Sequence, residues 1–480
     1  MRASGLKLLS APAVFIIFWF LLGGLDGQQR AVGAVFAATV ALWITEALPL
    51  AVTALLSTTS LVLIAGIPEK EAFAAYGDVV VPLFIGSFML AKAMERTGLS
   101  DRFAWLILSR RWATASPALL LLALGLIACV LSLFVSNTAT TAMMLPIGLS
   151  ILAVLKQGDR GAPFNIGVML MLTWGSSIAV GFPVGTPPNM IGIRELEKQA
   201  GIKIGFIDWM TFAMPVTIVM MFASWGVLWW MFRRGAPDTR GASSSADEAR
   251  DKLGKIKRSE INTLVAFSVS LSLWILPDLS VSILGKDHAW ASWLTAHIPA
   301  SVAALVGAGL LFLLRDQDGE QTLPWKQAAT IDWGTILLFA GGIALGNAMS
   351  SSGLAATTGK WLSEVSGASS TWSIAALCIG AAIALSELAS NTAAATTLMP
   401  IAIGLATAAG ANPVPAALGV ALGASMGFML PVSTPPNAIV YSSGLVPPRQ
   451  MIRAGFVIDV IGFFVILGCL RAILPLMGFA

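Results

Sequence analysis

Charged side chains are scarce in this chain of 480 residues, since Asp, Glu, Lys and Arg make up only 11% of it and hydrophobic residues make up 56%. The mean hydropathy is +0.82. A soluble protein of this composition would have an unmanageable apolar surface, so the scarcity of charge excludes a soluble fold. Apolar stretches long enough to cross roughly 30 Å of hydrocarbon recur from Ala11 to Ala480 with short loops between them. The sequence therefore predicts a polytopic membrane protein.

Cysteine and histidine are also rare. Cys129, Cys378 and Cys469 all lie inside apolar runs and lack the spacing of metal ligands, so they provide no disulfide framework. The two histidines, His288 and His297, fall in a predicted outer loop. A membrane-embedded enzyme would need a nucleophile with a base, or a metal cluster, and the intramembrane sequence has neither. Such an enzyme is therefore a remote alternative, and no cofactor is expected.

The chain is weakly basic, with a net charge of +4 and a pI near 9.0. This balance is ordinary for an inner-membrane protein and gives no reason to expect a nucleic-acid partner. With the N-terminus in the cytoplasm, 21 of the 29 basic residues fall on the cytoplasmic side, which favours that orientation and places the C-terminus outside. The apolar stretch at 11–25 resembles a secretory signal, but the many spans that follow favour a retained first helix.

Two short phrases occur twice in the chain. Ser-Asn-Thr-Ala stands at 136–139 and again at 390–393, which is 254 residues later (390 minus 136), and each copy is followed by Pro-Ile. Thr-Pro-Pro-Asn stands at 186–189 and again at 434–437, a shift of 248 (434 minus 186). The duplication extends to residues 83–99, which align without gaps on residues 338–354. The protein is therefore predicted to consist of two related halves.

An odd number of crossings in each half would turn the second half upside down relative to the first. The fold class is then all-α, with about eleven transmembrane helices and two re-entrant hairpins in two inverted repeats. The expected division is as follows: 1–30, an additional N-terminal helix; 31–233, the first repeat, with a hairpin tip at 136–138 and a broken helix at 185–189; 234–260, a Ser-rich cytoplasmic connector resembling a linker; and 261–480, the second repeat, with a tip at 390–392 and a break at 433–437.

Each repeated phrase makes sense as an interruption of a membrane helix. Irregular backbone is tolerated in hydrocarbon only where protein or a polar cavity satisfies it. The paired prolines of Thr-Pro-Pro-Asn lack amide hydrogens and stop one half-helix, while Ser-Asn-Thr consists of residues that cap a helix N-terminus. The first copy of Ser-Asn-Thr lies between the apolar arms 119–135 and 139–155. We therefore expect two hairpins with polar tips in the membrane and two discontinuous helices.

The ends of half-helices carry partial charge, positive at the amino end, where anions bind. Carbonyls at unwound turns, together with Ser, Thr and Asn oxygens, suit a small cation such as sodium. Ser132 precedes Ser136 by four residues and Ser386 precedes Ser390 by four, so each pair shares one helix face. This duplicated spacing gives two candidate cation cages.

Four segments are interrupted, at 132–146, 181–192, 386–400 and 427–440. They contain no Lys, Arg or His, and Glu387 is their only ionisable residue. A dianion bound there would need co-bound cations, because unit charges about 4 Å apart attract by roughly 4 kcal/mol at an effective dielectric near 20. A proton-driven mechanism would instead favour chains of Asp, Glu or His. We expect Glu46 and Lys92 to have interfacial or structural roles, and Glu387 to tune the second hairpin without a catalytic role.

These features resemble the divalent anion/sodium symporter family, through Thr-Glu-Ala-Leu-Pro at 45–49, both Ser-Asn-Thr tips and both Thr-Pro-Pro-Asn breaks. The resemblance covers nearly the whole chain. It implies a homodimer in the plasma (inner) membrane, surrounded by lipid, in which a scaffold part holds the dimer. A transport part would move like an elevator and carry a di- or tricarboxylate together with sodium.

The resemblance also implies a set of binding residues. The first sodium site would use Ser132, Ser136, Asn137 and Gly185, and the second would use Ser386, Ala389, Asn391 and Ser433. The substrate carboxylates would meet Ser136, Asn137, Thr138, Thr186, Ser390, Asn391, Thr392 and Thr434.

Both tips read Ser-Asn-Thr, which within the family favours a carboxylate over sulfate. The leading interpretation is therefore sodium-coupled symport of C4-dicarboxylates such as succinate, malate or fumarate, with Na⁺ as the coupling ion. The alternative is a sodium-independent dicarboxylate exchanger of the same fold.

Overall fold

The computed structural model describes residues 7–155 and 162–479. Within these ranges the protein is helical, and the only β-type pairing is an isolated bridge between Arg315 and Gln321. Seven helices of the described chain are long and apolar enough to cross a membrane, or eight if the pair α15 (Ala289–His297) and α16 (Ala300–Leu313), bent by 68°, forms one span. These helices support an integral membrane protein. The larger number of crossings expected from the sequence, about eleven, remains a prediction.

The first half of the chain forms an ordered series of helices, several of them short. They are α2 (Ser10–Leu21), α3 (Gly27–Thr45), α4 (Leu50–Leu63), α5 (Glu69–Ala74), η1 (Ala75–Gly77), α6 (Val80–Thr97), α7 (Leu99–Leu108), α8 (Pro117–Ser132), α9 (Asn137–Val154), α10 (Pro163–Ser177), η2 (Pro183–Gly185), α11 (Pro187–Glu195), the π-helical turn η3 (Leu196–Ala200) and α12 (Phe206–Phe232).

The second half begins with the connector helix and then follows a similar order. Its helices are α13 (Arg240–Lys252), α14 (Arg258–Leu284), α15, α16, α17 (Trp325–Ala328), α18 (Trp333–Ser351), α19 (Leu354–Ser366), α20 (Thr371–Leu388), α21 (Asn391–Ala408), α22 (Pro413–Gly423), α23 (Pro435–Ser442), α24 (Pro448–Ile473) and η4 (Leu474–Met477).

Corresponding segments of the two halves make corresponding contacts. A methyl group at Gly86 on α6 would lie 2.7 Å from the carbonyl carbon of Ala304 on α16, and one at Gly341 on α18 would lie 2.6 Å from the Cβ of Ala54 on α4. Both glycines therefore allow close contact between helices, as small residues do in membrane proteins. Gly98 and Gly353, aligned partners in the two halves, both adopt left-handed backbone with φ of 74° and 75°, which glycine adopts without strain.

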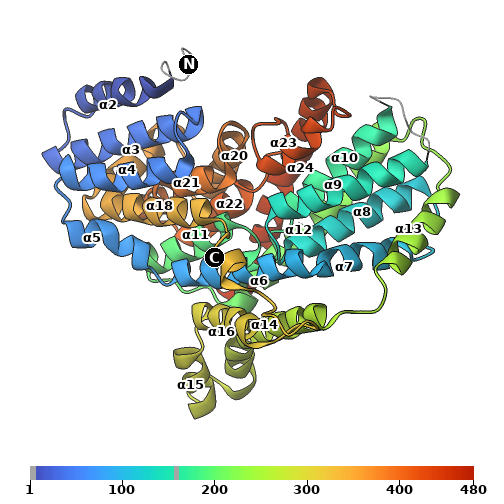
Figure 1. Ribbon diagram of the computed structural model, residues 1–480. Helices are drawn as coiled ribbons and strands as arrows, with labels where there is room; N and C mark the ends of the chain where they lie inside the picture. Colours follow the sequence, from blue (N-terminus) through green and yellow to red (C-terminus); the bar gives the residue numbers. More distant parts are fainter. Residues whose placement is uncertain (1–6, 156–161, 480) are drawn as a thin grey trace.

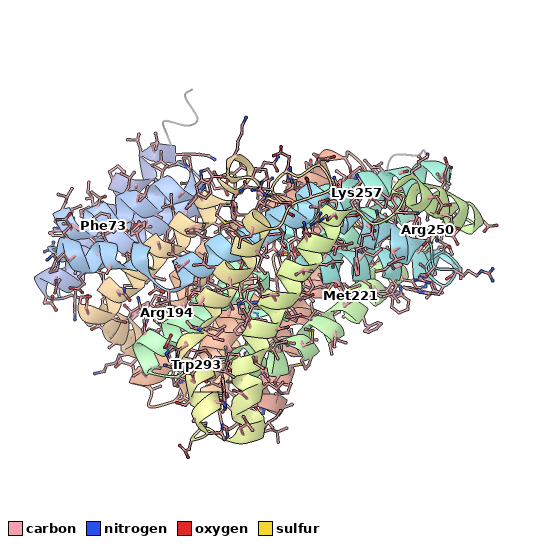
Figure 2. The ribbon with its side chains drawn as sticks, turned by 60° about the horizontal axis from the view of Figure 1, so that its bottom comes forward. Phe73, Arg194, Met221, Arg250, Lys257 and Trp293 are labelled. Atoms are coloured by element: carbon pink, nitrogen blue, oxygen red, sulfur yellow. The ribbon has the colours of Figure 1, made fainter. Side chains whose placement is uncertain are left out.

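The helices lie in two groups, and one arm of each broken helix lies between these groups. In Figure 1, α3, α4, α18 and α21 lie on one side, α8, α9, α10 and α13 lie on the other, and α11 and α22 lie between these groups. Helices α6 and α7 run along the lower edge of both groups, and α15 projects below them. The view in Figure 2 places Phe73 of α5 and Arg250 of α13 at opposite margins.

The connector between the halves contains a helix, whereas the sequence predicts a linker. In α13 the side chains of Asp247 and Arg250 form an ion pair of 3.2 Å, and those of Glu248 and Lys252 form one of 2.8 Å. Pairs three or four residues apart stabilise a helix by about 0.2–0.5 kcal/mol each. Charged residues of good helix propensity therefore give this segment regular structure where their polarity indicated a solvated loop.

Candidate functional site

Each Ser-Asn-Thr phrase begins the second arm of a helical hairpin. Ser136 is the N-cap of α9, and its Oγ accepts a 3.2 Å hydrogen bond from the amide of Ala139. Ser390 is the N-cap of α21 and accepts the same 3.2 Å bond from Ala393. Both serines thus satisfy one of the amides that a helix leaves unpaired at its start. The predicted tips at 136–138 and 390–392 lie at these starts.

The four-residue serine spacing places an oxygen pair behind each tip. The hydroxyl of Ser132 donates a 2.8 Å hydrogen bond to Oδ1 of Asn137, and the hydroxyl of Ser386 donates a 2.9 Å bond to Oδ1 of Asn391. Ser132 and Ser386 are both fully buried. Two oxygens facing each other in this way form part of a donor set suited to a hard cation, and the arrangement occurs once in each half.

Each Thr-Pro-Pro-Asn phrase begins a half-helix after an unwound segment. The side-chain amide of Asn189 donates to the carbonyls of Val180, at 3.0 Å, and Phe182, at 2.8 Å. The amide of Asn437 donates to the carbonyls of Gly427, at 2.9 Å, and Leu430, at 3.0 Å. The asparagines therefore satisfy buried carbonyls that the interrupted helices leave without a partner. The breaks are ordered structures held by their own sequence motif.

A glycine in each break has a close neighbour: for Gly185 it is the unwound segment of the same break, and for Gly427 it is the hairpin residue Ser386. A methyl group at Gly185 would lie 2.7 Å from the carbonyl oxygen of Ala179 and 3.7 Å from that of Leu133, at the end of α8. One at Gly427 would lie 2.9 Å from Oγ of Ser386 and 3.3 Å from Cβ of Ser433. Each predicted cation cage is therefore assembled from a hairpin and a break that are in contact.

A single cavity of about 510 Å³ lies between the two hairpins and the two breaks. All eight residues predicted to meet substrate line it, namely Ser136, Asn137, Thr138, Thr186, Ser390, Asn391, Thr392 and Thr434, and so does Gly185 of the first cage. Ser132, Ser386, Ala389 and Ser433 are buried behind its wall. Residues 254 positions apart in the sequence thus meet in one space.

Four helices begin at the wall of this cavity. Their N-cap residues, Ser136, Thr186, Ser390 and Thr434, all belong to the lining. The amino end of each helix carries roughly half a positive elementary charge, which attracts an anion. Because α11 and α23 start with two prolines, which have no amide hydrogen, the backbone amides available to an anion are mainly those at the starts of α9 and α21.

The cavity has no basic side chain among the described residues that line it, and its one charged residue is Asp332. The carboxylate of Asp332 accepts hydrogen bonds from the amide of Thr335, at 3.0 Å, and from its hydroxyl, at 2.6 Å, and so caps α18. A doubly negative guest would therefore meet helix dipoles and hydroxyl and amide groups, with no Lys, Arg or His to neutralise it. Cations bound in the adjoining cages would supply that charge.

The second cage differs from the first because Glu387 lies against it. The Oγ of Ser433 donates to Oε2 of Glu387 at 2.6 Å and to the carbonyl of Glu387 at 3.1 Å. The corresponding position in the first half, 133, is a leucine. The hydroxyl of Ser433 is thus engaged, which leaves its backbone carbonyl as the oxygen to offer a cation. Ser386 has a further bond of 2.7 Å to the carbonyl of Ala424.

Several features of the site lie outside the repeated motifs. The aromatic residues Phe134, Phe267 and Trp274 and the acid Asp332 line the cavity, and no repeated pattern marks them in the sequence. Asp459 is a further acid outside these motifs and is buried in α24. That residue does have a sequence signal, since it is one acid in an apolar run. Of the other polar candidates, Lys92 forms an exposed 3.0 Å ion pair with Glu95.

The chain is similar to known proteins over nearly its whole length. The family described as "Sodium:sulfate symporter transmembrane region" matches residues 2–477. The sodium-dependent dicarboxylate transporter SdcS of Staphylococcus saprophyticus is 32% identical over 447 residues, covering 90% of this chain and 84% of that protein. SdcS of Staphylococcus aureus strain USA300 is 32% identical over 449 residues, covering 91% and 84%. The solved structure of the Alcanivorax borkumensis YdaH transporter, at 15% identity, is similar with a TM-score of 0.55, covering 83% of this chain and 86% of that one.

Proposed function

The chain belongs to the sodium:sulfate symporter family, also called the divalent anion/sodium symporters, and from that premise we propose that it is a sodium-coupled dicarboxylate symporter. It is an integral membrane transporter and not an enzyme. The proposed substrates are C4-dicarboxylates such as succinate, malate and fumarate, or related di- and tricarboxylates. The proposed coupling ion is Na⁺, in keeping with the name of the SdcS relatives.

One observation carries this proposal: a cavity without basic side chains is surrounded by four helix amino ends and adjoins two duplicated serine–asparagine oxygen pairs. The amino ends favour an anion. The oxygen pairs favour hard cations. An anion and two cations held next to each other neutralise one another in a medium of low dielectric, where each alone would be unfavourable.

In the proposed binding mode, each asparagine serves both ligands. Oδ1 of Asn137 and of Asn391 would bind sodium together with the hydroxyl of the preceding serine, while the amide NH₂ groups would donate to the substrate carboxylates. The first sodium would also use Ser136 and the carbonyl of Gly185, and the second would use Ala389 and the carbonyl of Ser433. The substrate would further meet the side chains of Ser136, Thr138, Thr186, Ser390, Thr392 and Thr434.

We further propose that the chain comprises two inverted repeats, 31–233 and 261–480, and works as an elevator. The hairpins α8–α9 and α20–α21, with the broken helices α10–α11 and α22–α23, would form the moving transport part. The scaffold would include α4, α6, α16 and α18 and would hold a homodimer. Support comes from the matched close contacts at Gly86 and Gly341. The N-terminus would lie in the cytoplasm and the C-terminus outside.

Radiolabelled uptake by proteoliposomes tests the proposal. We expect a dicarboxylate to accumulate when an inward sodium gradient is imposed, and to equilibrate only slowly when choline replaces sodium. Competition by a panel of unlabelled acids and by sulfate then identifies the substrate class. Uptake that sulfate abolishes and C4-dicarboxylates leave unchanged would contradict the proposed substrate.

The same vesicles distinguish a symporter from an exchanger. They are preloaded with unlabelled succinate and assayed for labelled succinate without sodium on either side. A symporter of this design fails to exchange, because its empty cages leave the dianion without counter-charge. Full counterflow without sodium would overturn the symport proposal and favour a dicarboxylate exchanger of the same fold.

A further inference from the structure

A second cavity, of about 210 Å³, lies between helices α6, α7, α8 and α14. The buried side chains of Met94, Leu99 and Leu131 line it, and Ser268 is the one polar residue among the described residues of its wall. Ordered water needs several polar partners, so an apolar cavity of this kind stays dry and takes apolar ligands. We therefore searched its surroundings for the chemistry of an occupant.

Helix α14 provides the mouth of this cavity. Leu264, Phe267, Ser268 and Leu271 all line it, and their spacing of three, four and seven residues places them on one face of the helix. Leu264 is 43% exposed, and Ser268 is exposed as well. Helix α14 is long and apolar enough to cross a membrane, and Leu264 and Leu271 lie about 9 and 20 Å along it from its start at Arg258. The mouth therefore opens at the depth of the hydrocarbon.

Exposed basic residues lie at the start of the same helix. Lys255, Lys257 and Arg258 are all exposed, and Lys257 precedes Leu264 by seven residues, or two turns, so it lies over the face that lines the cavity. Figure 2 shows Lys257 at the end of α14 that is far from Trp293 of α15. The amino end of the helix adds its own partial positive charge. A negatively charged headgroup is complementary to this end of α14.

The acid in the first turn of α14 does not oppose this charge. Glu260 is 2% exposed, and its Oε1 accepts a 2.6 Å hydrogen bond from Nε of Arg102 on α7. The guanidinium of Arg102 also donates to the carbonyls of residues 253, 254 and 255, at 3.3, 3.0 and 3.2 Å. These bonds neutralise Glu260 and hold the segment that carries Lys255 against α7. The basic residues are thus presented on an ordered backbone.

From this arrangement we propose that an anionic phospholipid binds at α14, with its headgroup at Lys257 and Arg258 and one acyl chain in the apolar cavity. Juxtamembrane basic residues attract anionic lipids, and the cavity lies along the same helix face at the depth that an acyl chain reaches. Its volume equals that of about seven water molecules in the liquid. That space is too small for a helix of a second copy of this chain, and it suits part of a single hydrocarbon chain.

The lipid cavity shares a wall with the larger cavity. Phe134 and Phe267 line both, and their rings meet edge to face with centroids 5.8 Å apart. Phe134 lies two residues before Ser136 in the hairpin α8–α9, whereas Phe267 belongs to α14, which packs on α6 and α16. If the hairpin moves as the proposed function requires, an acyl chain in this position lies between the moving part and the scaffold. A bound lipid then favours the conformation described here.

Photolabelling of the unchanged protein tests the site directly. The probe is a phosphatidylglycerol with a photoactivatable diazirine in its acyl chain, added to phosphatidylcholine vesicles that contain the protein. We expect residues 130–134 and 264–271 to be labelled several-fold more than the outer face of α24, where Phe456 and Phe464 are exposed without lining a described cavity. Even labelling of both regions would reveal only surrounding lipid and would overturn the proposal. Label on α24 but none on α14 would show that another occupant, such as a second copy, covers the mouth, and would also overturn it.

Two matched serine variants test the position of the acyl chain. Ser268→Phe places an aromatic ring at the mouth and should weaken the binding of phosphatidylglycerol to the detergent-solubilised protein by roughly tenfold, as measured by native mass spectrometry. Ser272→Phe is the control, because Ser272 is exposed one turn further along α14 and lies outside the cavity lining. Equal affinities for the two variants and the unchanged protein would refute an acyl chain in this cavity.

Two lysine variants test the position of the headgroup. Lys257→Gln should weaken the binding of phosphatidylglycerol about fivefold, the effect of one basic residue near a membrane surface, and should leave that of phosphatidylcholine unchanged. The control is Lys286→Gln, since Lys286 is exposed just beyond the other end of α14. The same affinity for phosphatidylglycerol in both lysine variants would refute the headgroup contact.

The effect on transport rests on the proposed function and has its own readout. Dicarboxylate uptake is compared in vesicles with and without phosphatidylglycerol. The lipid should slow Ser272→Phe more than Ser268→Phe, and because both variants meet the same surface charge, their ratio isolates the bound lipid. Equal slowing would overturn the link to transport. A failure of all dicarboxylate uptake would count against the proposed function and leave the labelling result standing.

Discussion

The side-chain amide of Asn437 donates a 2.9 Å hydrogen bond to the carbonyl of Gly427 and so ties the start of α23 to the unwound segment before it. Asn189 makes the matching bond to Val180 in the first half. The two asparagines differ in the contacts of their side-chain oxygen Oδ1. Oδ1 of Asn437 accepts a 2.7 Å bond from the hydroxyl of Thr173 on α10, whereas Oδ1 of Asn189 meets no donor among the described residues. The second break is thus also anchored to the first half of the chain.

The replacement Thr173→Val should therefore lower stability, since it keeps the shape of the side chain and leaves Oδ1 of Asn437 buried without a donor. The expected loss is about 1–3 kcal/mol. Thr211→Val is the matched control, because the hydroxyl of Thr211 is exposed and donates only to the carbonyl one turn earlier in its own helix. Thermal unfolding of the detergent-solubilised protein measures both. Equal midpoints for the two variants would refute a contribution from the bond between Thr173 and Asn437.

A second prediction separates capping from ligand binding. Ser390 and Ser370 are both N-cap residues, and each accepts a 3.2 Å bond from the amide three residues later. Ser390 lines the cavity, whereas Ser370 is exposed at the start of α20. Replacement by alanine should cost each helix about 0.5–2 kcal/mol. Only Ser390→Ala should also raise the dicarboxylate concentration needed for half-maximal uptake, and a similar rise in Ser370→Ala would refute a ligand role for Ser390.

The repeated motifs predict much of the site, because duplicated chemistry is visible in the sequence without any knowledge of the fold. The tips at Ser136 and Ser390, the breaks at Thr186 and Thr434 and the polar residues of these motifs that line the cavity all follow from them. The contribution of Asn189 and Asn437 to holding the breaks does not follow, since the carbonyls that they bind are seven to ten positions away and have no sequence signature.

Features that arise from packing between distant segments are harder to predict. Asp459 is an example, since the sequence shows one acid in an apolar run but not which segment that acid packs against. Asp459 is buried on α24, which approaches the second break closely at Gly455. The connector is another example, since its polar and Ser-rich composition predicts a solvated linker, whereas ion pairs three and four residues apart support a helix in α13.

The proposed sodium cages give a third prediction. Asn137→Ala and Asn391→Ala each remove the oxygen that faces a buried serine hydroxyl. Each variant should raise the sodium concentration needed for half-maximal uptake by roughly tenfold, the equivalent of about 1.4 kcal/mol of lost ion binding, and should still insert into the membrane. Uptake measured against sodium concentration, normalised to the amount of reconstituted protein, gives the result. A sodium dependence like that of the unchanged protein in both variants would contradict the assigned cages.

The fourth prediction concerns Gly185, at which the unwound segment of the first break folds closely on itself. In Gly185→Ala the new methyl group would have to displace the carbonyl of Ala179, which would lie 2.7 Å away. We expect weaker sodium binding and a loss of stability, because the backbone around the first cage must move. Gly226→Ala is the control, since a methyl group at that exposed position of α12 meets no atom within 4 Å. That variant should be unchanged or slightly more stable.

The fifth prediction distinguishes two threonines that the sequence treats as equivalent. Thr186 and Thr434 are both N-cap residues of half-helices and both line the cavity. The hydroxyl of Thr434 accepts a 3.3 Å bond from the amide of Asn437, whereas that of Thr186 makes no capping bond. The hydroxyl of Thr186 is therefore the one that can serve a ligand without first giving up a structural bond.

Thr186→Val should accordingly weaken dicarboxylate uptake while leaving the unfolding temperature close to that of the unchanged protein. Thr434→Val should lower both, with about 0.5–2 kcal/mol lost from the cap. The two side chains have the same shape before and after the change, so the difference between the variants reports the hydroxyl groups alone. Uptake and thermal unfolding measured on the same preparations decide the matter. If Thr186→Val lost as much stability as Thr434→Val, the hydroxyl of Thr186 would have a structural role after all, and its assignment to the substrate would have to be withdrawn.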